Sequence, residues 1–144
     1  MNYKAILFYL GLFIFPLSGL AFLNILYSTY FDYFLSIDSY TITFFLALVT
    51  GSFFCYYGKN TLKKINFYEQ LLLIILVYLM SSIFIALPYY LSNYQITFFD
   101  SVFESFSGIT STGFSIFENI KYLDPTLILW RSSSQWIGGL YFLI

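Results

Sequence analysis

The sequence predicts an all-α integral membrane protein. Three observations support this prediction: charged residues are scarce, three apolar stretches are long enough to cross a bilayer, and a shorter amphipathic segment precedes a hydroxyl-rich loop. Only 9% of the residues are charged and 60% are hydrophobic, whereas a soluble domain carries about 25% charged residues. So few charges cannot cover a surface that faces water. We therefore expect a single membrane domain over residues 1–144.

The first apolar stretch covers residues 5–26, which meets the need of a spanning helix for about 20 apolar residues. It contains Gly11, Pro16 and Gly19, which spanning helices tolerate because neighbouring helices satisfy the freed backbone groups. A cleaved signal peptide is the alternative, since Lys4 precedes an apolar run. The run stays apolar beyond the candidate cleavage site, which favours a retained helix.

Two more spans follow in the chain. The second covers residues 41–57 and forms a leading helical pair with the first over residues 5–57. The third covers residues 69–91 and contains the strongest apolar run, residues 71–77. Pro88 lies near its end, where a helix loses few hydrogen bonds to a proline.

The distribution of basic residues predicts the orientation of these spans. The loop over residues 58–64 holds half of the six basic residues, and Lys4 falls on the same side of the membrane. The only basic residue in the segments expected on the outer side is Lys121. By the positive-inside rule the N-terminus is cytoplasmic, and we expect a multi-pass protein of the inner (plasma) membrane.

The segment over residues 95–108 is amphipathic and too short to cross the bilayer. Thr97 is followed three residues later by Asp100, which is close to a capping box, and an acidic residue is favoured at a positive helix start. About eleven helical residues would reach roughly 16 Å, half of the hydrocarbon core. Such a half-length helix must be buried in protein or line water, so we interpret it as a pore helix.

The next residues, Ile109-Thr110-Ser111-Thr112-Gly113-Phe114-Ser115, form a small, hydroxylated loop, called here the filter loop (residues 109–115). Gly113 can adopt backbone angles that turn successive carbonyls toward one axis. Carbonyl oxygens arranged in this way replace the water shell of a potassium ion, and the C-terminus of the preceding helix favours a cation. The candidate ligands are the backbone carbonyls of Thr110, Ser111, Thr112 and Gly113. An ordinary turn is the alternative.

Asp100 and Glu104 lie four residues apart on one face of the predicted pore helix. One interpretation is a helix cap together with an outer vestibule that attracts cations, and a purely structural role is the other. A catalytic carboxylate pair is unsupported, because no other polar machinery accompanies them.

Composition argues against an enzyme. The chain has no histidine, which excludes a Ser-His-Asp triad and an imidazole metal site. Its single cysteine, Cys55, cannot form an internal disulfide. The net charge of −1 gives no reason to expect nucleic-acid binding. We expect no cofactor and no metal other than a transported monovalent cation.

A final helix is predicted from Pro125, which is suited to the first position of a helix. Arg131, Ser134 and Gln135 on this helix are costly to expose to lipid, so we expect them to face protein or a water-filled cavity. The sequence stops at Ile144, about 19 residues later, so we expect this helix to be incomplete.

The combined motifs resemble the N-terminal part of the TrkH/KtrB potassium transporter family, and TrkH in particular. The resemblance covers the chain weakly to about residue 79 and strongly after it. The residues that carry it are Ala86-Leu87-Pro88, residues 98–108, Ile109-Thr110-Ser111-Thr112-Gly113-Phe114, Arg131 and Gln135-Trp136-Ile137-Gly138-Gly139.

The resemblance implies potassium uptake through four helix–pore loop–helix repeats that surround one ion path. Thr110, Ser111, Thr112 and Gly113 match the first filter loop, and Gly113 matches a glycine associated with potassium preference, where plant relatives that transport sodium have serine. Residues 69–144 match only the first repeat, so a fragment that does not conduct alone is expected. The resemblance also implies two partners, which are membrane lipid and a cytoplasmic nucleotide-binding regulatory subunit of the TrkA/KtrA type. It is compatible with a homodimer of the complete protein.

Two alternatives remain open from the sequence. One is a short subunit that assembles with copies of itself into a cation channel. The other is a non-transporting membrane protein that acts in assembly or interaction, in which the filter-like loop is a coincidence.

Overall fold

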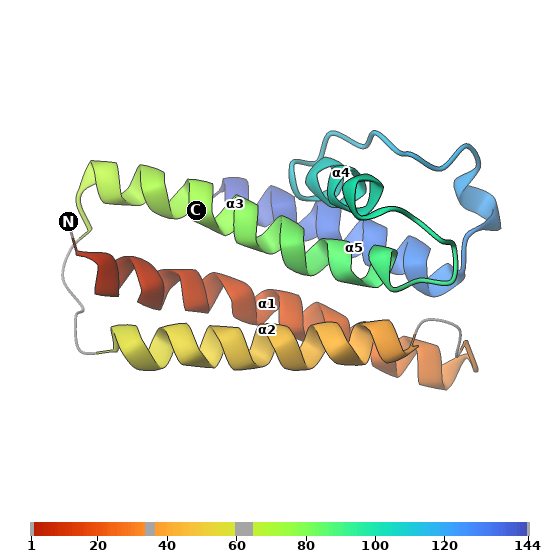
Figure 1. The fold of residues 1–144 in the computed structure, drawn as a ribbon, viewed down its shortest axis with the longest axis horizontal. Helices are drawn as coiled ribbons and strands as arrows, with labels where there is room; N and C mark the ends of the chain where they lie inside the picture. The colour runs from red at the N-terminus through yellow and green to blue at the C-terminus, as the bar shows by residue number, and fades with distance from the viewer. Residues whose placement is uncertain (1, 34–36, 60–64, 144) are drawn as a thin grey trace.

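The computed structural model describes residues 2–33, 37–59 and 65–143, and these residues are helical with no strand among them (Figure 1). Five α-helices and a short 3-10 helix follow one another along the chain. In order they are α1 (Tyr3–Tyr30), α2 (Ile37–Gly58), α3 (Phe67–Tyr90), α4 (Phe98–Ile109), the 3-10 helix η1 (Ile120–Tyr122) and α5 (Pro125–Phe142).

Three of these helices, α1, α2 and α3, are long and apolar enough to cross a membrane. Each of the three predicted spans therefore corresponds to a helix of sufficient length and apolar character. The helices exceed the predicted bounds at most ends, and α1 has 28 residues where 22 were expected over residues 5–26. The extra turns carry tyrosines such as Tyr3, Tyr27 and Tyr30, which suit the interface where a helix leaves the apolar layer. Lys63 and Lys64, on which the predicted orientation partly depends, lie outside the described residues.

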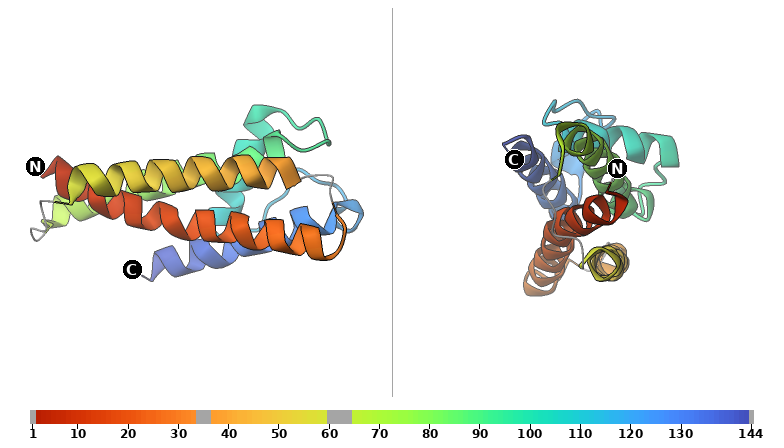
Figure 2. Two further views of the ribbon diagram at one scale, coloured as in Figure 1. Left: turned by 90° about the horizontal axis from the view of Figure 1, so that it is seen from below. Right: turned by 90° about the vertical axis from the view of Figure 1, so that its left-hand side faces the viewer.

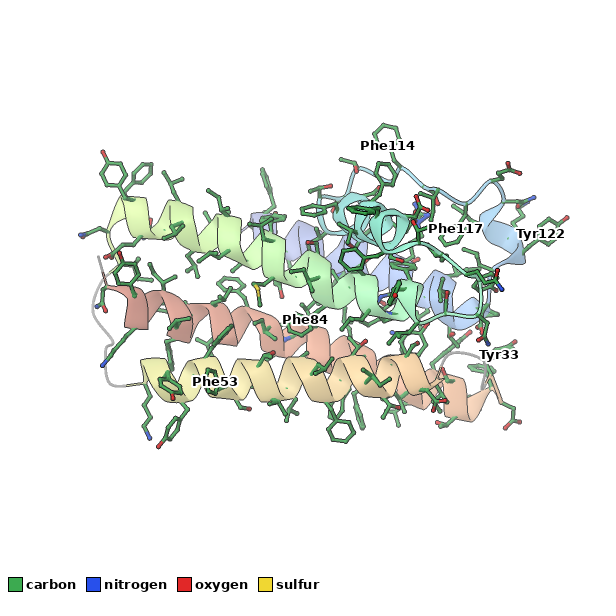
Figure 3. The ribbon with its side chains drawn as sticks, in the orientation of Figure 1. Tyr33, Phe53, Phe84, Phe114, Phe117 and Tyr122 are labelled. Atoms are coloured by element: carbon green, nitrogen blue, oxygen red, sulfur yellow. The ribbon has the colours of Figure 1, made fainter. Side chains whose placement is uncertain are left out.

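Helices α1 and α2 form an antiparallel pair along the length of the molecule (Figure 1). They approach closely at Gly11, where an added Cβ would lie 2.7 Å from the Gly51 carbonyl oxygen and 2.8 Å from Sγ of Cys55. Small residues at such a crossing let two backbones pack closely in a membrane, where apolar burial gives little drive for association. Phe53, on the outer side of α2, is 54% exposed (Figure 3).

The core lies where α1, α3 and α5 meet. Trp130 of α5 is fully buried, and its indole N–H donates to the Ile85 carbonyl of α3 at 3.1 Å. Tyr40 of α2 packs beside Trp130, with ring centroids 5.6 Å apart, and donates to the hydroxyl of Thr126 at 3.2 Å. Phe84 lies on the side of α3 that faces α1 (Figure 3). These contacts join α5 to α3 and to α2.

Helix α4 is seen nearly end-on in Figure 1 while α1, α2 and α3 lie lengthwise, so it crosses the long helices. It lies toward the end of the bundle opposite the N-terminus, as the left view of Figure 2 also shows. Its 12 residues begin after Thr97, whose side chain caps the helix by accepting from the Asp100 N–H at 3.2 Å. The predicted short helix and its Thr97 cap are both present.

Helix α5 begins as the sequence predicted, with Pro125 in its first turn. The Asp124 side chain caps it by accepting from the Thr126 N–H at 2.8 Å. Its 18 residues correspond to about 27 Å. Helix α5 is not among the candidate apolar spans, because its middle is polar over residues 131–135.

Candidate pore helix and filter loop

The end of α4 is positioned by direct contact with α5. Gly138 lies so close to the α4 backbone that an added Cβ would collide with the Ile109 carbonyl. One turn earlier on α5, Ser134 packs against Gly108 of α4. A Cβ added to Gly108 would lie 2.5 Å from the Ser134 Oγ atom. Since glycine lacks a Cβ, two glycines at this contact allow the helices to approach to backbone distance. The C-terminal end of α4 is therefore set by α5, and so is the origin of the filter loop.

The backbone after α4 alternates in handedness. Thr110 ends the helix with φ −85°, Ser111 has φ +55° and Gly113 has φ +80°. Positive φ is costly for a residue with a Cβ and costs glycine little. The Gly113 requirement predicted from the sequence is present, and Ser111 is a second left-handed residue that the sequence did not indicate.

Ser107, on the last turn of α4, holds the loop by several hydrogen bonds, among them two from the Thr112 hydroxyl, which donates to the Ser107 carbonyl and to the Ser107 hydroxyl, each at 3.3 Å. The Ser107 hydroxyl donates to the Phe114 carbonyl at 2.6 Å, and the Ser107 carbonyl accepts from the Thr112 N–H at 3.1 Å and the Gly113 N–H at 3.4 Å. The hydroxyl of Ser111 donates to the Gln135 carbonyl of α5 at 3.0 Å. These bonds fold the filter loop back onto its own helix and onto α5.

Three consecutive carbonyls of the loop remain without a donor. Within the part of the chain that the structure describes, no group donates a hydrogen bond to the backbone oxygens of Thr110, Ser111 or Thr112. All three residues are exposed. The Gly113 oxygen differs, because it accepts from Arg131 at 3.0 Å, although the sequence grouped all four carbonyls as ion ligands.

Behind the loop lies a buried ion pair between α4 and α5. The Arg131 Nη1 atom lies 2.8 Å from Oε1 of Glu104. Glu104 is 1% exposed and Arg131 is 7% exposed. The structure confirms that Arg131 and Ser134 face protein, while Gln135 is only half-buried.

Asp100 and Glu104 have different surroundings although they lie four residues apart on α4. Asp100 is exposed in the first turn and accepts from the Thr97 hydroxyl at 2.6 Å. Glu104 is buried, and its carboxylate is occupied by Arg131. Sequence reasoning missed this pairing. The signal was available, since a charged residue at membrane depth requires a partner.

The side chains of the loop point in different directions. Phe114 is 70% exposed, and Figure 3 shows its ring directed away from the helices. Its carbonyl faces the opposite way, toward Ser107 and Arg131. Farther along, Phe117 lies half-buried beside the bundle, whereas Tyr122 of η1 is 83% exposed (Figure 3).

Comparison with known proteins found several relatives, although no family model matches the chain. A cation transporter of Methanocaldococcus jannaschii, itself uncharacterized, is 33% identical over 107 residues, which are 71% of this chain and 23% of that protein. The Trk system potassium uptake protein TrkH of Escherichia coli K12 is 31% identical over 103 residues, covering 71% of this chain and 21% of TrkH. The Trk system potassium uptake protein TrkI of Halomonas elongata is 38% identical over 73 residues, which are 51% of this chain and 15% of TrkI.

The chain spans less than a quarter of the length of these relatives. The relatives are transporters, and the fold described above, with three candidate spans, is that of a multi-pass membrane protein. The sequence similarity and the helical arrangement agree, and the chain belongs to the TrkH-like family of Trk potassium uptake proteins.

Proposed function

We propose that the chain contributes one pore helix and one filter loop to a potassium-uptake pore. The observation that carries this proposal is a run of three carbonyls, on the exposed residues Thr110, Ser111 and Thr112, that accept no hydrogen bond from any of the described residues. Lipid cannot satisfy such groups, whereas a desolvated potassium ion is coordinated by carbonyl oxygens. Gly113 serves this loop through its left-handed backbone, and its carbonyl, which also accepts from Arg131, remains a fourth candidate ligand.

Charge near the loop supports a cation. The C-terminus of α4 lies at the start of the filter loop, and a helix end of this kind carries about half a negative charge. Glu104 adds no net field, since Arg131 neutralises it. Asp100 remains as an exposed carboxylate at the opposite end of α4, and we assign it to the helix cap and to an outer vestibule that concentrates cations.

One filter loop forms only part of a ring around an ion. In this proposal the remaining loops come from segments outside residues 1–144. The greater length of the relatives, of which this chain matches 21% to 23% in TrkH and the M. jannaschii transporter, favours further repeats in the same polypeptide. Separate copies of this chain are the alternative source.

The proposal also specifies surroundings and partners. Lys4 lies in the first turn of α1 and Lys59 directly follows α2, whose last residue, Gly58, is packed against Lys4. We place this end of the bundle on the cytoplasmic side of the inner membrane. A nucleotide-binding regulatory subunit of the TrkA/KtrA type would bind on that side, and the complete protein would form a homodimer. The protein acts as a transporter and not as an enzyme.

The test is uptake by the polypeptide as its own gene produces it, in a cell without other potassium uptake. The wild type should restore potassium uptake. Gly113→Ser should lower the ratio of potassium to sodium uptake by about tenfold, which corresponds to ~1.4 kcal/mol of discrimination. Gly19→Ser is the control, because an added Cβ there meets nothing within 4 Å.

Two results would contradict the proposal. One is a gene product that reaches the membrane without any potassium uptake above background. The other is an unchanged uptake ratio in Gly113→Ser, which would support a non-transporting role for the loop. The mass of the gene product, measured in the same cells, separates a polypeptide with further repeats from an assembly of short copies.

A further inference from the structure

The Glu104–Arg131 pair is nearly sealed from solvent. The two side chains come from α4 and α5, and their closest N–O distance is 2.8 Å. Removing charges from water is expensive, and an ion pair offsets that penalty only when further hydrogen bonds satisfy the remaining atoms. The second carboxylate oxygen of Glu104 and the second terminal nitrogen of Arg131 therefore need hydrogen-bond partners of their own.

Those atoms bind the backbone that leaves the filter loop. The Glu104 Oε2 atom accepts from the Ile116 N–H at 3.0 Å and from the Ser115 hydroxyl at 3.2 Å. The Arg131 Nη2 atom donates to the Gly113 carbonyl at 3.0 Å and to the Phe114 carbonyl at 3.3 Å. The Glu104 carboxylate thus accepts hydrogen bonds from the N–H and O–H groups of residues 115 and 116. The Arg131 guanidinium donates hydrogen bonds to the carbonyls of residues 113 and 114.

Gly113 is the residue where such a restraint has the greatest effect. It has no side chain, its φ is +80°, and even an added Cβ would meet nothing within 4 Å. Glycine has little intrinsic preference among backbone conformations. Packing at Gly113 therefore does not select the direction of its carbonyl, and the hydrogen bond from Arg131 does.

We propose that Arg131 and Glu104 are positioning residues for ion selectivity, which fix the peptide after Gly113 and thereby hold the carbonyls of Thr110, Ser111 and Thr112 at a spacing suited to potassium. This inference rests on the proposed function. Without the pair, the peptide after Gly113 can rotate, and the carbonyls before it can close around a smaller ion. Sodium is that ion, since selectivity depends on the spacing and field strength of the carbonyls.

The test removes both charges at once, because a single substitution leaves an unpaired buried charge and endangers folding. The double variant Glu104→Gln with Arg131→Gln is made in the polypeptide as its gene produces it. It should reach the membrane in wild-type amounts, yet its ratio of potassium to sodium uptake should fall by about tenfold or more. Hydrogen exchange of the amides of residues 112–117 should accelerate, while exchange in α1 and α2 stays unchanged.

The matched control is Glu118→Gln with Lys121→Gln, which removes the same two charges from exposed positions of the outer loop. It should leave the uptake ratio and the exchange rates unchanged. Arg131→Lys gives a second comparison, because lysine keeps the charge and lacks the forked donor geometry. It should lower the ratio although the ion pair remains, which a requirement for charge alone would not produce.

Three outcomes decide between the proposals. A wild type that transports potassium, with a double variant that loses selectivity, supports both. A wild type that transports and a double variant that keeps its uptake ratio within about twofold overturns the positioning role and leaves the proposed function intact. A wild type without potassium uptake overturns the proposed function, and the selectivity role falls with it.

Discussion

The carbonyl oxygen of Ile109, the last residue of α4, lies against the backbone of Gly138 in α5 with no room for a methyl group between them. This contact links the helix that carries the filter loop to the helix that carries Arg131. Any side chain at position 138 must therefore displace α4 or α5, and the filter loop with them.

Gly138→Ala tests this contact. The added methyl group would collide with the Ile109 carbonyl, and overpacking of this kind costs about 1–3 kcal/mol. We expect less protein in the membrane, a lower temperature of unfolding in detergent, and a reduced potassium-to-sodium uptake ratio in the protein that remains. Gly139→Ala is the control, since its Cβ would meet nothing within 4 Å. Equal behaviour of the two variants would contradict the contact.

Ser107→Ala tests the attachment of the filter loop to its own helix. The substitution removes the 2.6 Å bond to the Phe114 carbonyl, and a lost hydrogen bond costs about 1 kcal/mol. Hydrogen exchange at residues 112–115 should become faster. Ser105→Ala is a matched control, because Ser105 is also buried on α4 but donates to the Val102 carbonyl of its own helix at 2.7 Å. A loop equally protected in both variants would refute the role of Ser107.

Gly11→Ala tests the close pairing of α1 and α2. The added Cβ would lie 2.7 Å from the Gly51 carbonyl oxygen and 2.8 Å from Sγ of Cys55. We expect a loss of roughly 1–3 kcal/mol of stability, measured by unfolding in detergent, and faster reaction of Cys55 with a thiol reagent as α2 moves away. Gly19→Ala on the same helix should change neither quantity, because the position is open.

Thr97→Ala tests the start of the pore helix. The Thr97 side chain accepts from the Asp100 N–H, and loss of such a cap costs about 1 kcal/mol. Hydrogen exchange in the first turn of α4 should accelerate, while the α3 amides keep their rates. Thr97→Ser retains the hydroxyl and should behave as the wild type. If alanine and serine gave the same exchange rates, the cap would contribute nothing.

Much of this architecture was readable from the sequence because it depends on local patterns. Long apolar runs specify spanning helices wherever they occur, since each residue contributes independently to transfer into lipid. The start of α4 at Thr97 and the start of α5 at Pro125 follow from capping chemistry, which involves neighbours in the chain. Gly113 was identified for the same reason, because positive φ is a property of one residue.

Contacts between segments distant in the chain were decided only by the tertiary structure. The sequence placed Asp100 and Glu104 together on one face, whereas the fold exposes the first and pairs the second with Arg131, 27 positions farther along. It also gave no sign that the Gly113 carbonyl, unlike the other candidate ligands, accepts a hydrogen bond from Arg131 of α5. The physical reason is the same in both cases. The environment of a charge or a carbonyl depends on which helix packs against it, and periodicity within one helix does not specify its neighbour.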